Sequence, residues 1–224
     1  MERALEICGL PPGSRVADIG CGPGGTLEHL ERTGIYRSVG LDYSGTLLAE
    51  AVPRLASGRL VRGRAETLPL KTGCFDALFC ECVLSILKDR IAALGEFARV
   101  LKEGGFLIVS DVFGHGGPGQ ERLEEKLQGF RTKGLLVKEG LLDLLARLGF
   151  SLLLWEEHGR LLKEFAARMI LAGVCLPDAW GFKQGQKGKK TNRPQISYFL
   201  LVALKAGTVF QSVGNEGDGK SWTT

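Results

Sequence analysis

The sequence predicts an α/β protein whose core is a parallel sheet with helices on both faces. Two observations lead to this fold class. In the first half of the chain, short apolar runs alternate with segments that have the apolar spacing of amphipathic helices. Strands that alternate with helices in this way build parallel sheets. In addition, the glycine-rich stretch 20–25 directly follows the first apolar run, as expected for a strand that leads through a tight turn into a helix.

The composition is that of a globular protein with one domain. The chain has 224 residues, of which 44% are hydrophobic and 24% charged, and its net charge of +4 is no nucleic-acid signature. The apolar runs are as short as strands, so we expect no membrane span and no signal peptide, and a cytoplasmic location. The six cysteines are scattered, which favours reduced thiols. We expect residues 1–205 to form the domain and 206–224 a flexible tail.

The elements of the first half follow from local signals. Pro11 and Pro12 end a first helix, and Ser44 can cap the helix that follows the second strand. Apolar residues spaced three and four apart predict a helix over 88–101, and Gly104 and Gly105 then turn the chain into a strand. The expected helices are at 1–8, 26–32, 44–51 and 88–101, and the expected strands at 16–19, 38–42, 59–63, 75–80 and 106–110.

The second half keeps the alternation less strictly. We expect a sixth strand at 150–155 and a last strand at 196–204, each a short apolar run. The glycine-rich segment 114–119 and the polar segment 177–194 predict loops. Apolar spacing predicts further helices at 123–130, 140–148 and 161–170.

The glycine turn predicts a cofactor pocket, and two cofactors fit the residues. Gly20, Gly22 and Gly25 match G-x-G-x-x-G, and Asp42 follows at about the distance of the acid that binds a ribose, so NAD has to be weighed. Asp18 argues against NAD, because its carboxylate would be desolvated beside a negatively charged pyrophosphate. S-adenosylmethionine carries a sulfonium and an ammonium group instead, which this carboxylate would favour. Asp42 suits either cofactor.

Five segments then follow one another in a set order: VADIGCGPG at 16–24, GLDYS at 40–44, RAETLPL at 64–70, CFDALF at 74–79 and ARVLKEGGFLIVSD at 98–111. Together they resemble the motifs of class I S-adenosylmethionine-dependent methyltransferases, most closely the type 11 family, whose relatives methylate quinone precursors. The resemblance covers 16–111 and, more weakly, 138–205. It implies a doubly wound, Rossmann-like sheet of seven strands, mostly parallel with an antiparallel last strand, and an enzyme that methylates a small molecule.

The resemblance also implies roles for single residues. S-adenosyl-L-methionine would be the cofactor, with Asp42 on its ribose and Tyr43, Ala65 and Glu66 around its adenine. Its methionine end would lie at Asp18, Gly20, Cys21, Gly22 and Gly24, and Cys80 and Glu81 would face its sulfonium. The chain departs from the family pattern at Arg64, which stands where the family has an acid for the adenine amino group. It also has only fifteen residues before Val16, where the family has more chain to close the pocket.

Two residues are candidates for a general base that removes a proton from the acceptor. Glu81 follows the fourth strand and His115 lies in the glycine-rich loop after the fifth, so both belong to the carboxyl edge of the sheet where such folds bind ligands. His158 has a weaker claim by position. The alternative for Glu81 is a carboxylate that binds backbone amides, and for His115 an exposed side chain without a role.

Other hypotheses remain open on the sequence. Cys80 or Cys82 could join Cys175 to bind a soft acceptor such as arsenite, but core thiols are the default and we expect no metal site. The basic stretch 183–193 predicts a solvated loop, with an anionic substrate or RNA as the second interpretation. A protein that binds the cofactor without catalysis is the alternative from another class. The sequence names neither the acceptor nor an oligomeric state.

Overall fold

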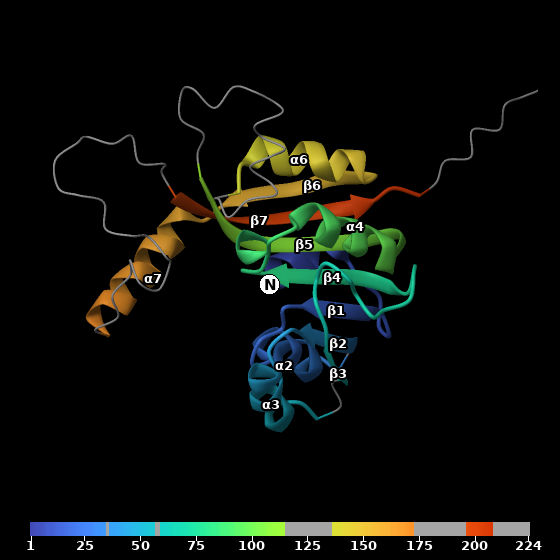
Figure 1. The fold of residues 1–224 in the computed structure, drawn as a ribbon, viewed down its shortest axis with the longest axis horizontal. Coiled ribbons are helices and arrows are strands. Elements are labelled where there is room, and N and C mark those ends of the chain that lie inside the picture. Colours follow the sequence, from blue (N-terminus) through green and yellow to red (C-terminus); the bar gives the residue numbers. More distant parts are fainter. Residues whose placement is uncertain (35, 57–58, 115–135, 173–195, 208–224) are drawn as a thin grey trace, which may run out of the picture.

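The structure, a computed structural model, describes residues 1–34, 36–56, 59–114, 136–172 and 196–207. Its centre is a seven-stranded sheet (Figure 1). The strands, in chain order, are β1 (Arg15–Ile19), β2 (Arg37–Asp42), β3 (Arg59–Arg62), β4 (Phe75–Glu81), β5 (Leu101–Gly114), β6 (Phe150–Glu157) and β7 (Ile196–Lys205).

The order of the strands across the sheet is β3-β2-β1-β4-β5-β7-β6. All pairs from β3 to β5 are parallel, whereas β7 runs antiparallel to both β5 and β6. The chain therefore crosses over between β3 and β4, and the adjacent strands β1 and β4 diverge into loops at their carboxyl ends, where doubly wound folds bind ligands. The predicted fold class, with an antiparallel last strand, is confirmed.

The helices of the described residues match the predicted helices within a few residues. They are α1 (Glu2–Cys8), α2 (Gly25–Arg32), α3 (Gly45–Ala51), α4 (Arg90–Val100), α6 (Lys138–Arg147) and α7 (Gly159–Leu171), with short 3₁₀ turns at η1 (Val52–Arg54) and η2 (Leu84–Ile86). Ser44 caps α3 as predicted, since its hydroxyl accepts from the Leu47 N–H at 3.3 Å. Asp89 caps α4 by accepting from the Ala92 N–H at 3.0 Å.

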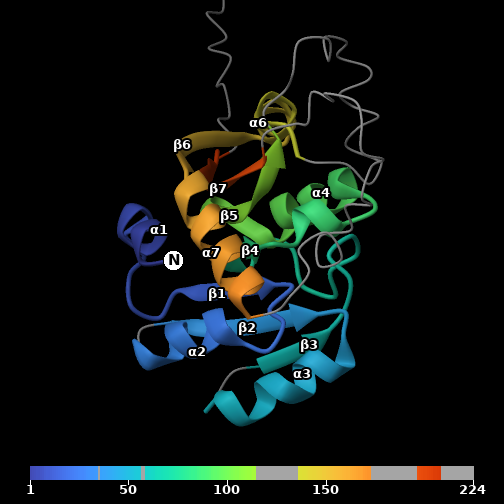
Figure 2. The same ribbon diagram turned by 90° about the vertical axis from the view of Figure 1, so that its left-hand side faces the viewer.

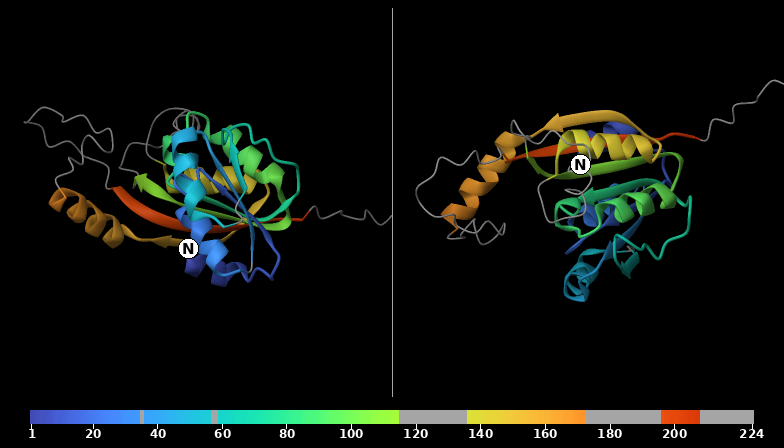
Figure 3. Two further views of the ribbon diagram at one scale, coloured as in Figure 1. Left: turned by 90° about the horizontal axis from the view of Figure 1, so that it is seen from below. Right: turned by 45° about the horizontal axis from the view of Figure 1, so that its top comes forward.

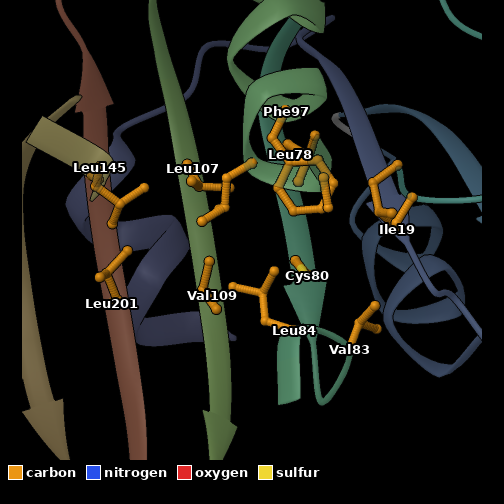
Figure 4. Packing of buried hydrophobic residues seen from close by; sticks show 14 of the residues in the cluster. Ile19, Leu78, Cys80, Val83, Leu84, Phe97, Leu107, Val109, Leu145 and Leu201 are labelled. Atoms are coloured by element: carbon orange, nitrogen blue, oxygen red, sulfur yellow. The ribbon is translucent and has the colours of Figure 1, made fainter. Parts of the chain in front are cut away.

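Alternating side chains along the strands bury one apolar cluster on each face of the sheet. Leu78, Leu107 and Leu201 of β4, β5 and β7 belong to the larger cluster, which α4 and α6 cover with Phe97 and Leu145 (Figure 4). On the opposite face, strand residues of the other parity pack against α1. Figure 2 shows α1 and α4 on opposite sides of the sheet. The parity of a strand residue therefore decides which face its side chain serves.

Two elements differ in extent from the prediction. β5 begins directly after α4 and is fourteen residues long, because its pairing with β4 continues through a register shift between Phe75 and Ala77. α7 projects past the end of the sheet (Figure 3) and leaves Leu161 and Phe165 about half exposed. The predicted helix at 123–130, most of the loops 114–119 and 177–194, and the tail beyond residue 207 lie outside the described residues. None of the described helices is long and apolar enough to cross a membrane.

Candidate functional site

A cavity of about 590 Å³ lies at the carboxyl ends of β1, β2 and β4, the edge where the sequence predicts the cofactor. Its size suits a small ligand. The glycine turn, the end of β2, the segment after β3 and the loop after β4 each contribute a part of the wall. The lining residues are Ile19, Gly20, Gly22, Leu41, Asp42, Tyr43, Ser44, Leu47, Gly63, Arg64, Ala65, Glu66, Glu81, Cys82, Val83, Ile86, Leu87 and Lys88.

The glycine turn depends on backbone angles that favour glycine. Gly20, Gly22 and Gly24 have φ values of +77°, +50° and +85°. The turn is tied to β2, because the Gly20 N–H donates to the Leu41 carbonyl at 2.6 Å. A Cβ at Gly20 would collide with the Val83 side chain, whereas a Cβ at Gly22 would meet no atom within 4 Å. Gly20 thus permits the close approach of two loops, and Gly22 leaves the cavity open.

Asp42 fixes the end of β2 to the glycine turn. One carboxylate oxygen accepts from the Gly22 N–H at 2.9 Å, and the other accepts from the Ser44 N–H at 2.7 Å. The residue is only 9% exposed, yet it lines the cavity. Each oxygen keeps a further lone pair. The carboxylate is therefore held in place and can still accept hydrogen bonds from a ligand.

Asp18 is a buried carboxylate beside two others. It is 2% exposed at the end of β1, and its pKa is raised well above the ordinary value. Burial is the largest cause, followed by the negative charges of Glu81 and Asp42. Among the described residues, none donates a hydrogen bond to its side chain. Asp18 is not among the residues that line the cavity, but it directly precedes Ile19 and Gly20, which do. Its surroundings consequently disfavour a further negative charge nearby and favour a positive one.

Glu81 lies at the cavity wall and is held by hydroxyl groups. One carboxylate oxygen accepts from the Thr26 hydroxyl at 2.7 Å, and the Ser110 hydroxyl lies 3.5 Å from the other. Thr26 belongs to the first turn of α2, so this contact links the glycine turn to β4. The structure thus gives Glu81 hydroxyl partners in place of the backbone amides considered above.

An aromatic side chain and an arginine, Tyr43 and Arg64, line another part of the cavity. Tyr43 is 64% exposed, and the guanidinium carbon of Arg64 lies 5.2 Å from the centre of its ring. Arg64 also pairs with Glu66 at 3.6 Å, and the Arg62 Nε donates to the Tyr43 carbonyl at 3.2 Å. The arginine that departs from the family pattern therefore covers the ring predicted to pack on adenine.

The loop after β4 is positioned by buried charges that the sequence analysis missed. Arg90 is 1% exposed and donates to the carbonyls of Leu84 and Ser85 at 2.7 and 2.9 Å. Asp111 is fully buried and accepts from the Ser85 N–H at 2.9 Å. Burial is the main cause that raises the pKa of Asp111, and its charge acts on Arg90. These two residues hold the loop that carries Val83, Ile86 and Leu87 to the cavity.

Other predicted site residues lie elsewhere. Cys80 is fully buried in the cluster beneath α4 (Figure 4). It therefore does not line the cavity, contrary to the prediction, whereas its neighbours Glu81 and Cys82 do. Cys21 packs against Leu27 and Leu48, and neither it nor Gly24 lines the cavity. His158 follows β6 and pairs with Glu156 at 3.5 Å. His115 and Cys175 lie outside the described residues, and within the described part no group of three potential metal ligands occurs.

The sheet with its antiparallel β7, the glycine turn and the acid at the end of β2 together define the class I methyltransferase architecture. Residues 17–109 match the type 11 family model, described as a methyltransferase domain. Over these residues the chain is similar to this family. The resemblance inferred from the five sequence segments is confirmed.

Curated relatives match the chain over different lengths. An O-methyltransferase of Pyrenophora dematioidea is 27% identical over 86% of this chain and 75% of its own. The (+)-O-methylkolavelool synthase of Herpetosiphon aurantiacus is 26% identical over 91% of this chain and 78% of its own. A demethylmenaquinone methyltransferase of Beutenbergia cavernae is 34% identical, but the match covers only 48% of this chain and 44% of that protein.

Solved structures show the same fold at low identity. A geranyl diphosphate C-methyltransferase from Streptomyces coelicolor A3(2), in complex with S-adenosyl-L-homocysteine, has a TM-score of 0.72 and 17% identity over 92% of this chain and 74% of its own. A (4+2)-cyclase has a TM-score of 0.68 and 23% identity over 92% and 79% of the two chains. Because proteins of different activity share the fold, these neighbours speak for the architecture alone.

Proposed function

We propose that the cavity binds S-adenosyl-L-methionine and that the protein transfers its methyl group to an oxygen atom of a small-molecule acceptor. The observation that carries the cofactor assignment is the buried carboxylate of Asp18, which lies beside Glu81 and Asp42 without a hydrogen-bond donor from the described residues. A cationic ligand relieves this arrangement, because its charge offsets the mutual repulsion of the acids.

The same charges count against a dinucleotide. A pyrophosphate at the glycine turn would add negative charge beside a carboxylate that is already difficult to ionise. The sulfonium and the ammonium of S-adenosylmethionine are the opposite case. Members of this family use this cofactor, and the local electrostatics of this chain agree with it.

We assign the parts of the cofactor along the length of the cavity. Gly20 and Gly22 lie against its methionine end, with Asp18 behind them, and Asp42 accepts from the ribose hydroxyls. Further along the wall are the three residues proposed for the adenine, Tyr43, Ala65 and Glu66. Cys21 and Gly24 do not line the cavity, so we assign them only a role in the shape of the turn.

The choice of oxygen as the acceptor atom rests on the length of the matches. The two relatives that match along most of this chain have names that specify O-methylation. The relative named for a quinone precursor matches about half of the chain, which is the half that holds the cofactor. Since acceptors are selected by parts outside the cofactor motifs, the longer matches carry more weight for the acceptor.

The chemistry asks little of the protein beyond alignment. Methyl transfer is an in-line displacement in which the acceptor oxygen attacks the methyl carbon and the neutral thioether leaves. The protein contributes by holding both reactants in line and by excluding water, and such positioning can lower the barrier by several kcal/mol. We also propose a cytoplasmic location, because the described cysteines are free thiols.

The test combines binding with transfer. Calorimetry should detect binding of S-adenosylhomocysteine. Labelled S-adenosylmethionine should pass its methyl group to a compound in the small-molecule fraction of a cell extract, and the new bond should withstand mild alkali. Methyl esters release methanol in mild alkali, methyl ethers release methyl iodide in hot hydriodic acid, and C-methyl groups withstand both, so the label should be released by the second treatment only. Binding without transfer to any fraction would contradict the activity and leave the cofactor assignment intact. Label that is found only in RNA or protein would contradict the small-molecule acceptor.

A further inference from the structure

A row of polar side chains crosses the sheet beside the cavity, on the face that α1 covers further along. Glu81 of β4, Ser110 of β5 and Tyr198 of β7 lie next to one another on this face, since Glu81 pairs with Ser110 in register and Tyr198 pairs with Val112, two residues further along β5. Thr26 of α2 completes the row at its other end. These residues are far apart in sequence and meet only through the pairing of the strands.

The contacts in this row are specific. The Glu81 carboxylate accepts from Thr26 at 2.7 Å and lies 3.5 Å from the Ser110 hydroxyl. The Tyr198 hydroxyl interacts with the Ser110 side chain and lies 3.6 Å from the Cys82 sulfur. Burial is the largest cause that raises the pKa of Tyr198, so its phenol keeps its proton.

Cys82 has the backbone geometry of a constrained site. Its φ of +55° is the single positive value of a residue other than glycine among the described residues, and its N–H donates to the Ser110 carbonyl at 2.8 Å. Strained conformations of this kind persist where the surroundings enforce them, and they cluster at ligand sites. Glu81 of the row and its neighbour Cys82 both line the cavity.

The opposite side of this end of the cavity is apolar, and the charges around Glu81 are acidic. Val83, Ile86 and Leu87 supply the apolar lining. The titratable groups that act on one another here are Asp18 of β1, Asp42 of β2, Cys82, Asp111 of β5 and Tyr198, none of which is a cation; the nearby cation Arg90 of α4 acts on Asp111. Lys88 also lines the cavity, but it is exposed and is not among the charges that shift Asp18 or Tyr198.

We propose that this polar row is the acceptor subsite, that the acceptor presents an uncharged hydroxyl group on an apolar body, and that Glu81 takes the hydroxyl proton. This inference rests on the proposed function. As the acceptor oxygen forms its bond to the methyl carbon, the carbon–sulfur bond breaks and its electron pair stays on sulfur. The proton passes to the Glu81 carboxylate, so that a neutral ether, a neutral thioether and a carboxylic acid result.

The charges of the subsite select against other acceptors. A carboxylate or phosphate would approach three acidic side chains and be repelled by them. An amine would be held as an ammonium ion by the same acids and would then lack the lone pair that attacks the methyl group. A neutral hydroxyl escapes both penalties, and Glu81 raises its nucleophilicity by accepting its proton.

Three naphthalenes that differ only in the head group test this selection. They are 2-naphthol, 2-naphthoate and 2-(aminomethyl)naphthalene, each titrated into protein saturated with S-adenosylhomocysteine and each offered with labelled S-adenosylmethionine. We expect 2-naphthol to bind at least about tenfold more tightly than 2-naphthoate and to be the one that is methylated. Equal or tighter binding of the acid, methylation of the amine, or a naphthol that neither binds nor reacts would overturn the inference.

Substitutions distinguish the residue that takes the proton from the residues that position the acceptor. Glu81→Gln keeps the hydrogen bonds to Thr26 and Ser110 and should lower kcat for 2-naphthol by about 10²–10⁴-fold. It should also remove the acidic limb of the pH–rate profile, which a structural role would not do. Tyr198→Phe and Ser110→Ala should raise KM for 2-naphthol and leave that limb in place. Glu50→Gln, at an exposed acid of α3, is the matched control with wild-type kinetics.

Calorimetry with S-adenosylhomocysteine keeps this inference apart from the proposed function. Tyr198→Phe and Ser110→Ala should bind S-adenosylhomocysteine with wild-type affinity, and Glu81→Gln should still bind it, if the row serves the acceptor. A Glu81→Gln variant that retains wild-type kcat would refute the role of Glu81, even though the cofactor assignment would stand. A wild-type protein that does not bind S-adenosylhomocysteine would instead refute the proposed function itself.

Discussion

Replacing Gly22 by alanine tests the glycine turn, and Gly9 offers a matched control. Both glycines have nearly the same left-handed backbone, with φ values of +50° and +53°, and neither would place a Cβ within 4 Å of another atom. The difference is their location, because Gly22 lines the cavity and Gly9 ends α1. The two substitutions therefore share the backbone strain and differ in the ligand site.

The expected magnitudes follow from this geometry. A left-handed alanine costs about 1–2 kcal/mol, so each variant should unfold about 2–8 °C below the wild-type protein. In Gly22→Ala, the added methyl group also points into the cavity where the cofactor would lie. Crowding of this kind costs about 1–3 kcal/mol, which corresponds to roughly a 5- to 150-fold loss of affinity.

Thermal unfolding measures the first effect, and calorimetry with S-adenosylhomocysteine measures the second. We expect Gly9→Ala and Gly22→Ala to lose similar stability, while Gly9→Ala keeps wild-type affinity. If Gly22→Ala binds S-adenosylhomocysteine as tightly as Gly9→Ala does, the turn does not contact the cofactor and the reasoning is refuted.

Three further substitutions probe the acids and the loop after β4. Asp42→Ala should weaken the binding of S-adenosylhomocysteine by about 1–3 kcal/mol, measured by calorimetry, because a charge-assisted hydrogen bond to the ribose is lost; unchanged affinity would place the ribose elsewhere. The raised pKa of Asp18 means that the folded protein resists its ionisation, so the stability of the unliganded protein falls as pH rises from the unfolded value of 3.8 through the folded one. Asp18→Asn should flatten this decline in the free energy of unfolding above about pH 4, measured by urea unfolding, and should also weaken cofactor binding; an unchanged decline would show that Asp18 is not the buried acid responsible. Arg90→Met should cost about 3 kcal/mol in urea unfolding, because it strips two carbonyls and Asp111 of their buried partner; a loss within about 0.5 kcal/mol would show that the loop does not need it.

The geometry of the glycine turn and of Asp42 could be predicted because its constraints are local. The turn at Gly20 and Gly22 requires glycine by backbone angle, and Asp42 lies one residue before the turn to α3, so their positions along the chain suffice. Cys80 shows the limit of this reasoning. The end of β4 was predicted correctly, but the parity of the strand points Cys80 into the core and Glu81 into the cavity.

The polar row of Glu81, Ser110 and Tyr198 could not be predicted, because it depends on pairing between distant strands. Tyr198 reaches Cys82 across 116 residues only because β7 pairs antiparallel with β5, and the sequence around it reads as an ordinary buried strand. Arg90 gave no signal either, since an arginine at the start of a helix usually faces solvent. Its function becomes visible only through the two carbonyls it binds.

We propose that the pocket binds the cation-bearing methionine tail of S-adenosylmethionine and not a pyrophosphate, and one calorimetric comparison distinguishes the two. S-adenosylmethionine, S-adenosylhomocysteine and NAD are titrated into the same preparation of the protein. We expect binding of the first two and no heat from NAD. Micromolar binding of NAD without a response to either sulfur compound would contradict it.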